Sequence, residues 1–193
     1  PARKLKLPPN CKKLLKQPLH FSDQKDGPLQ NVVVRVVKGI EKLPTLPIPQ
    51  KEVEIDQRSC IYSPRVSVAR VGQSVTFINS DPLFHNVKSV TKKNKSFNIA
   101  MPRQGQRKTR VFENPEFFLQ TKCSVHPWMR AYVAVVDHGY FAISNKNGQF
   151  RLPPMPSGDY LLEVWHEELG AQQVSFTITE GDQNLSITMK ANH

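Results

Sequence analysis

The stretch FFLQTKCSVHPWMRAYVAVV, residues 117–136, contains two predicted β-strands and the short loop that joins them. Residues 117–122 lead into Cys123, and residues 131–136 form the kind of apolar run found in strands that are buried on both faces. Within the loop, Cys123, His126 and Met129 follow one another at three-residue intervals. A short loop that is held by a strand at each end is expected to direct all three side chains toward one point.

These three side chains offer a thiolate, an imidazole and a thioether to a metal ion. Soft sulfur ligands together with imidazole suit copper, which cycles between one-electron states. Zinc prefers four strong ligands, and calcium and magnesium prefer oxygen. The loop therefore predicts a copper site.

A trigonal copper site needs a second imidazole, and His85 supplies it. This residue lies in the sequence NSDPLFHNV, residues 79–87, just after the predicted strand 73–79. The remaining histidines stand apart from one another and form no pair at metal-ligand spacing: His20, His138, His166 and His193.

The rest of the chain has the sequence pattern of a β-protein. It contains 16 prolines against 9 glycines, and helical periodicity is scarce. Strand-like segments, with turn residues between them, lie at 31–37, 53–55, 65–71, 73–79, 149–152, 160–165, 174–179 and 185–189. Many short strands of this kind predict an all-β fold, either a sandwich or a barrel.

The region from residue 52 to residue 137 resembles a cupredoxin. The loop CSVHPWM has the C-x2-H-x2-M spacing of the amicyanin type, and HNV at 85–87 matches the upstream triplet of amicyanins and plastocyanins. The resemblance implies a Greek-key β-sandwich that holds one type 1 (blue) copper. It also implies an electron carrier without catalytic residues, rather than an enzyme. The alternatives are a copper-carrying or copper-loaded interaction module and a subunit of a larger redox complex.

The resemblance also implies a role for each predicted ligand. His85, Cys123 and His126 would be the equatorial ligands, and Met129 the axial one. Met101 is a conceivable axial substitute, but it lies far from Cys123 in the chain.

Further residues around the copper take their expected roles from the same family. Asn86 would tie the two ligand loops together by a hydrogen bond to Ser124. His126 would be the point where electrons enter and leave, inside an apolar collar. Trp128 fits equally well as a collar residue or as a core residue. The collar would be made of Pro82, Leu83, Phe84, Pro127 and Trp128.

The formal net charge of +11 is concentrated in two segments that contain no acidic residue, 1–16 and 82–112. Basic stretches favour nucleic acid, an anionic membrane surface or an acidic protein, or they simply keep a surface solvated. The chain has no zinc-finger spacing and no aromatic RNA-binding motif, so we expect no nucleic acid partner. It has no apolar run long enough to span a bilayer. An acidic redox protein is the preferred partner.

Three cysteines are present, and Cys123 is assigned to the metal. Cys11 and Cys60 then either pair with each other or remain as two buried thiols. A disulfide would fit an oxidising compartment. The first residue is Pro1 rather than Met, which favours a processed start. We therefore expect an exported, bacterial protein in the periplasm or elsewhere outside the cytoplasm.

The predicted organisation has four parts. Residues 1–30 are an irregular basic arm, 31–43 contain a strand of the C-terminal sandwich, 50–137 are the copper domain, and 139–193 are a second β-sandwich. GQFRL at 148–152 and PSGDYLL at 156–162 resemble the carboxypeptidase regulatory-like (transthyretin-like) sandwich. The arrangement as a whole resembles bacterial cupredoxin-like proteins labelled "methylamine utilization". That label does not make methylamine a substrate of this chain.

Overall fold

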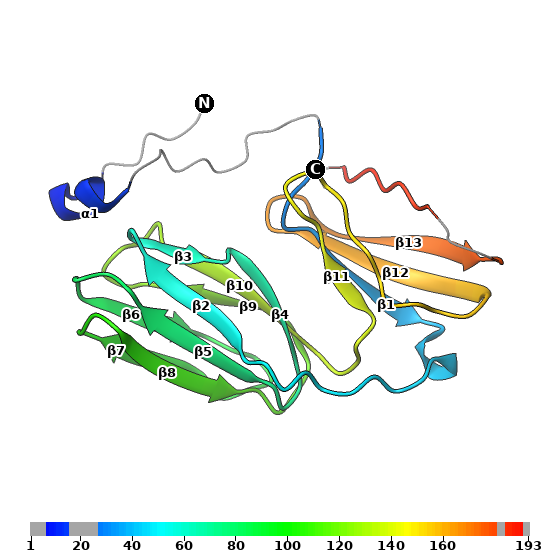
Figure 1. The fold of residues 1–193 in the computed structure, drawn as a ribbon, viewed down its shortest axis with the longest axis horizontal. Coiled ribbons are helices and arrows are strands. Elements are labelled where there is room, and N and C mark those ends of the chain that lie inside the picture. The colour runs from blue at the N-terminus through cyan, green and yellow to red at the C-terminus, as the bar shows by residue number, and fades with distance from the viewer. Residues whose placement is uncertain (1–6, 16–26, 181–183, 191–193) are drawn as a thin grey trace. The chain divides into compact units, whose positions relative to one another are not determined.

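The computed structural model describes residues 7–15, 27–180 and 184–190. Here the chain is almost entirely β, which confirms the predicted fold class (Figure 1). It divides into two compact units. The first contains Ile48–Asp137 and the short helix α1, and the second contains strand β1 and the strands after His138.

The first unit is built from two β-sheets. The five-stranded sheet has the order β4 (Val66–Arg70), β10 (Arg130–Val136), β9 (Glu116–Lys122), β6 (His85–Ser89) and β7 (Phe97–Met101). The four-stranded sheet has the order β3 (Ile61–Ser63), β2 (Val53–Arg58), β5 (Ser74–Asn79) and β8 (Gln106–Val111). The pairs β4–β10 and β2–β5 are parallel, and the other pairs are antiparallel.

Alternating apolar residues create the core of this unit. Ile55, Val75 and Phe77 come from the smaller sheet, and Leu119 and Val133 come from the larger one. All five side chains are at most 1% exposed. Burial of an aliphatic or aromatic side chain of this size stabilises a fold by about 1.5–3 kcal/mol. The core therefore provides a rigid support for the loops at the ends of the strands.

The sheet topology brings the predicted ligand loops to the same end of the unit. Strand β6 starts at His85 and runs antiparallel to β9, with Ser89 opposite Thr121 and Lys88 opposite Lys122. The start of β6 therefore lies beside the end of β9, where Cys123 follows. His85 and Cys123 are brought together by strand pairing rather than by closeness in the sequence.

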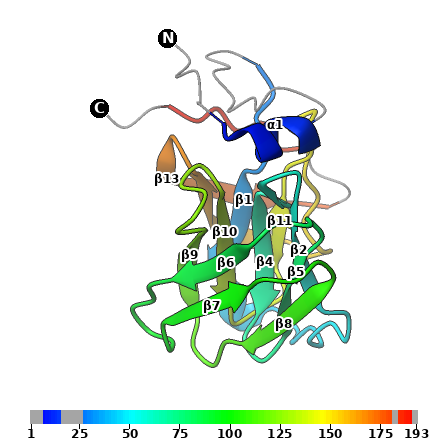
Figure 2. The ribbon, with the colours of Figure 1, turned by 90° about the vertical axis from the view of Figure 1, so that its left-hand side faces the viewer.

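The segment predicted as an irregular arm contains a helix, α1 (Pro9–Leu14), which lies outside the two sheets (Figures 1 and 2). The prediction was wrong for these residues, because proline suits the first turn of a helix and Leu7 and Leu14 pack against the core. Cys11 is joined to Cys60 by a disulfide, with the Cα atoms 5.6 Å apart, so the predicted pairing is confirmed. Residues 1–6 and 16–26 of the arm lie outside the described residues.

The second unit is formed by one sheet in the order β11 (Phe141–Ile143), β1 (Val33–Lys38), β12 (Gly158–His166) and β13 (Gly170–Ile178). All its strand pairs are antiparallel. A 3-10 helix, η1 (Ile40–Lys42), follows β1. The buried residues of its core lie mainly on the sheet: Val32, Val34, Val36, Tyr140, Tyr160, Leu162 and Val164.

Two predicted strands of this unit are not strands in the structure. Residues 149–152 and 185–189 have irregular backbones. Their apolar side chains still pack against the core of the unit: Phe150, Leu152, Leu185, Ile187 and Met189. Their alternating pattern therefore reflects packing against a sheet rather than membership of one.

Glu116, at the start of β9, holds the basic loop 92–94. Its carboxylate accepts the backbone N–H groups of Lys92 at 2.6 Å, Lys93 at 2.9 Å and Asn94 at 3.1 Å. Burial raises the pKa of Glu116, but these hydrogen bonds outweigh burial and leave the pKa below its ordinary value of 4.5. The folded state therefore favours the ionised carboxylate.

We expect Glu116→Gln to lower the free energy of unfolding at pH 7 by about 1–3 kcal/mol, because it weakens charge-assisted hydrogen bonds. A depressed folded-state pKa stabilises above the unfolded-state pKa, and this gain disappears as the pH falls through the folded-state pKa. The difference between variant and wild type should therefore shrink below about pH 4.5. Urea unfolding of the metal-free protein at several pH values measures this difference in unfolding free energy, and the exposed Glu113→Gln is the control. A difference that is independent of pH would contradict this assignment.

Candidate metal centre

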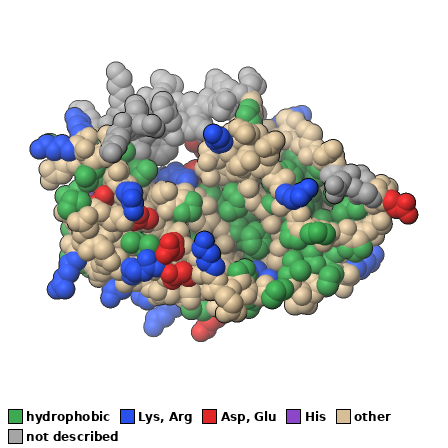
Figure 3. All heavy atoms as spheres, viewed as in Figure 1, with side chains coloured by type: hydrophobic (Ala, Val, Ile, Leu, Met, Phe, Trp, Pro, Cys, Tyr) green, Lys and Arg blue, Asp and Glu red, His purple; other side chains and the backbone are tan. Residues whose placement is uncertain are grey.

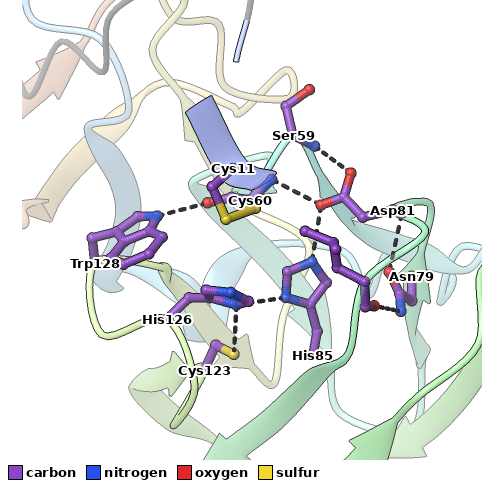
Figure 4. The surroundings of a disulfide bond; sticks show 10 residues. Cys11, Ser59, Cys60, Asn79, Asp81, His85, Cys123, His126 and Trp128 are labelled. Carbon is purple, nitrogen blue, oxygen red and sulfur yellow. Dashed lines mark hydrogen bonds and ion pairs between the residues drawn. A yellow bond between two sulfur atoms is a disulfide. The ribbon is translucent and has the colours of Figure 1, made fainter. Parts of the chain in front are cut away.

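Three predicted ligands meet at one end of the first unit (Figure 4). His85 Nδ1 lies 2.9 Å from His126 Nδ1, and Cys123 Sγ lies 3.7 Å from His126 Nδ1. The donor atoms of all three residues lie within 4.8 Å of one another. His85, Cys123 and His126 are 0%, 2% and 7% exposed, so the cluster is largely shielded from water.

Backbone hydrogen bonds close the loop that carries two of these ligands. Cys123 N–H donates to the Met129 carbonyl at 3.2 Å, and Met129 N–H donates to the His126 carbonyl at 2.8 Å. Met129 is 1% exposed and belongs to the same core cluster as Cys123. Met101 is also buried and pairs with His85 across β6 and β7, but its sulfur accepts a hydrogen bond from Gln57 Nε2 at 3.0 Å.

The Cys123 thiol is placed so that its thiolate is favoured. Burial raises its pKa, but a hydrogen bond from the His85 imidazole and several backbone N–H groups outweigh burial. The net result is a pKa below its ordinary value. The thiolate is the form of cysteine that can bind a metal, and these contacts favour it.

The two imidazoles differ in their proton affinity. Burial lowers the pKa of His85, but the hydrogen bond to Asp81 and the interactions with Cys123 raise it to about 9. Burial and the neighbouring charge of His85 lower the pKa of His126. These surroundings therefore favour the protonated form of His85, the neutral form of His126 and the deprotonated form of Cys123.

Asn86 and Ser124 link the two ligand loops. The backbone N–H of Ser124 donates to Asn86 Oδ1 at 2.6 Å, and Asn86 Nδ2 donates to Ser124 Oγ at 3.3 Å. The hydroxyl of the buried Tyr62 also donates to the Asn86 carbonyl at 2.8 Å. The two loops are therefore joined by polar contacts in addition to the strand pairing.

The structure adds two features that the sequence analysis did not identify. Asp81 is 2% exposed, and its carboxylate lies 2.9 Å from His85 Nε2. The Cys11–Cys60 disulfide is beside the ligands, because both its sulfur atoms lie within 4.8 Å of a ring nitrogen of His126. These sulfur atoms are bonded to each other and do not act as thiolate ligands. The one sequence feature that could have indicated the contact between Asp81 and His85 is their separation of four residues.

The residues predicted to surround His126 at the surface differ in exposure. Of the predicted collar residues, Phe84 is 46% exposed and Pro127 is exposed as well; Val125, which was not among them, is 50% exposed. Trp128 is half-buried and packs partly against the core, and its Nε1 donates to the Cys60 carbonyl at 2.9 Å. This packing agrees with the core alternative for Trp128, and its role in a collar stays a prediction.

The basic residues of segment 82–112 lie at the surface, on β6, on the loop between β6 and β7, on the loop before β8 and on β8 itself. On the face shown in Figure 3, acidic side chains lie among Lys and Arg side chains. Arg107 forms ion pairs with Glu52 and Glu54. The other exposed basic side chains of this segment are Lys88, Lys92, Lys93, Lys95, Arg103, Lys108 and Arg110. No helix in the described ranges is long and apolar enough to cross a membrane.

Among solved structures, the chain is similar to a purple cupredoxin from Nitrosopumilus maritimus, with 29% identity over 44% of this chain and 99% of that one, at a TM-score of 0.38. A Cu(I) structure of an amicyanin variant is 24% identical over 44% of this chain and 81% of that one, at a TM-score of 0.39. A copper-containing nitrite reductase from Thermus scotoductus SA-01 is 20% identical over 52% of this chain and 27% of that one, at a TM-score of 0.41. No protein-family model and no curated protein matches the chain.

Proposed function

We propose that this chain is a type 1 copper protein that carries single electrons between redox partners. The observation that carries the proposal is the convergence of His85, Cys123 and His126, whose donor atoms lie within 4.8 Å of one another in a buried setting. Met129 completes the proposed set as the axial ligand, supported by its burial and its place in the same closed loop. One copper ion is expected per chain.

The chemistry of these donors fits copper better than other common metals. Two imidazoles and one thiolate leave the fourth position to a thioether, which is a weak ligand. Structural zinc sites use four strong ligands, and hard cations need oxygen. Copper bound here would supply reversible one-electron chemistry.

The protein would contribute a rigid and nearly dry ligand set. The strand pairing between β6 and β9 and the link between Asn86 and Ser124 hold the two ligand loops in place. Ligands that cannot move much keep similar positions in both redox states, so little rearrangement accompanies electron transfer. His126 is the proposed route for electrons, because it lies next to the exposed Val125 and Pro127.

The test is to load the intact chain with Cu(II) and record its visible absorption and electron paramagnetic resonance spectra. We expect an intense thiolate-to-copper band that disappears on reduction with ascorbate and returns on oxidation. Copper that binds without this band, or that passes quickly to a chelator, would instead support a copper-carrying module. A chain that binds no copper would overturn the proposal.

An acidic redox protein is the proposed partner, supported by the exposed basic residues of segment 82–112. Electrostatic steering weakens as salt shortens the screening length from about 30 Å at 0.01 M to about 3 Å at 1 M. We therefore expect electron exchange with an acidic protein to slow as salt rises. Lys108→Glu should slow it further, and the exposed Lys146→Glu in the second unit is the matched control. Rates that do not change with salt would contradict a charge-steered encounter.

Two further assignments complete the proposal. A location outside the cytoplasm is supported by the Cys11–Cys60 disulfide, since such bonds persist in oxidising compartments.

We infer that the second unit is a carboxypeptidase regulatory-like (transthyretin-like) module, interrupted in the sequence by the copper unit. The pairing of β1 with β11 and β12 supports this inference.

A further inference from the structure

Asp81 is a buried aspartate whose carboxylate contacts the predicted ligand His85 and the nearby turn at Ser59 and Cys60. It accepts the backbone N–H of Ser59 at 2.6 Å and that of Cys60 at 2.8 Å, and it contacts His85 Nε2 at 2.9 Å. The residue is 2% exposed. A carboxylate buried to this extent is costly unless it is well paired, so these contacts must compensate for the water that it has lost.

The contact with Asp81 determines which nitrogen of His85 faces the other ligands. An ionised carboxylate only accepts hydrogen bonds, so Nε2 must carry a hydrogen. The opposite nitrogen, Nδ1, then points to His126, at 2.9 Å from its Nδ1 (Figure 4). A carboxylate that holds the far side of a ligating imidazole in this way fixes the ring and makes it a stronger donor.

Asp81 is itself held by the turn between β2 and β3. Ser59 and Cys60 both have left-handed backbones, with φ of 56° and 55°. Successive N–H groups in a turn of this kind form a concave site for an anion, and here both groups donate to Asp81. The disulfide with Cys11 anchors the same turn, and the Cys60 carbonyl accepts the hydrogen bond from Trp128. One turn thus contacts both ligand loops.

We propose that Asp81 is a positioning residue of the metal centre. It fixes His85 with Nδ1 toward Cys123 and His126, and it places a negative charge behind this ligand. The inference rests on the proposed copper site. A negative charge at this position stabilises the more highly charged form of a bound metal, so Asp81 favours retention of Cu(II) over Cu(I).

The test compares wild type with Asp81→Asn, and uses Glu54→Gln as the control. The control removes one exposed negative charge from the same unit without touching the ligands. For Asp81→Asn we expect Cu(II) affinity, measured against a competing chelator, to fall about tenfold to a hundredfold. The fall in Cu(I) affinity should be smaller, and the reduction potential should therefore rise. If Asp81→Asn lowers the affinities for Cu(I) and Cu(II) equally, or if its affinities equal those of Glu54→Gln, the proposed effect of the Asp81 charge is wrong.

A second measurement needs no metal and does not depend on the variant being folded. In the metal-free wild type, nitrogen-15 NMR should show a hydrogen-bonded Nε2–H on His85 that exchanges slowly with water. A folded wild type without this signal would overturn the proposal even if Asp81→Asn cannot be purified. If the signal is present but wild type gives no thiolate-to-copper band, the positioning by Asp81 stands and the copper function fails.

Discussion

Cys123→Ser is expected to abolish the intense visible absorption of the copper-loaded protein. The band requires a thiolate bound to the metal, and Cys123 offers the one free thiol among the described residues. A serine hydroxyl is a hard, weakly acidic donor that copper binds poorly in this setting. Affinity for copper should fall by more than about a hundredfold, the upper range for losing only a hydrogen-bonding partner of a ligand.

Absorption spectra, electron paramagnetic resonance and chelator competition measure this effect. Ser124→Ala is the matched control, because it changes the neighbouring residue, keeps the Ser124 backbone N–H bond to Asn86 and removes only a 3.3 Å contact. The control should keep the intense band with small changes in its position. Persistence of the band in Cys123→Ser would show that Cys123 is not the thiolate ligand.

Removal of the Cys11–Cys60 disulfide should cause the largest loss of stability. The bond joins residues 49 positions apart, and loop-closure entropy for a loop of this size corresponds to about 4 kcal/mol. We expect the double variant Cys11→Ala, Cys60→Ala to lose about 2–4 kcal/mol of unfolding free energy. We expect the metal centre to be destabilised as well, because the turn at Cys60 is hydrogen-bonded to both Asp81 and Trp128.

This prediction is measured by urea unfolding of the metal-free protein in a Cys123→Ser background, where no third thiol can form mixed disulfides. The protein with the intact disulfide should lose a similar amount of stability when a reductant is added, whereas the double variant should not respond. A double variant as stable as its parent would mean that α1 and the Cys60 turn are held by packing alone.

The ligand loop is the part of the site that the sequence predicts most directly. Cys123, His126 and Met129 are neighbours in the chain, so their spacing alone limits where their side chains can lie. The all-β class could also be predicted, because the alternation of apolar and polar residues in segments such as 73–79 is a local signal for a strand. The same signal failed at 149–152 and 185–189, because alternation also results when an irregular segment packs on a sheet.

Asp81 shows what the sequence did not predict. An aspartate followed by proline is commonly a turn residue, and nothing local indicates that its carboxylate is buried. Its partners Ser59 and Cys60 belong to another turn, and they reach it only because β2 pairs with β5 within one sheet. Helix α1 was not predicted either, because it is held by contacts with distant parts of the chain. These are the disulfide to Cys60 and the packing of Leu7 and Leu14 against the core.

The class of fold, the kinds of donor atom and the spacing within the ligand loop can thus be predicted from the sequence alone. These properties arise from side-chain chemistry and from periodicity over a few residues. The folded structure was needed to show that His85 faces Cys123 and His126, that Asp81 lies behind His85, and that the disulfide lies beside His126. Contacts between residues distant in the chain depend on strand order and register, which result from the packing of the whole core.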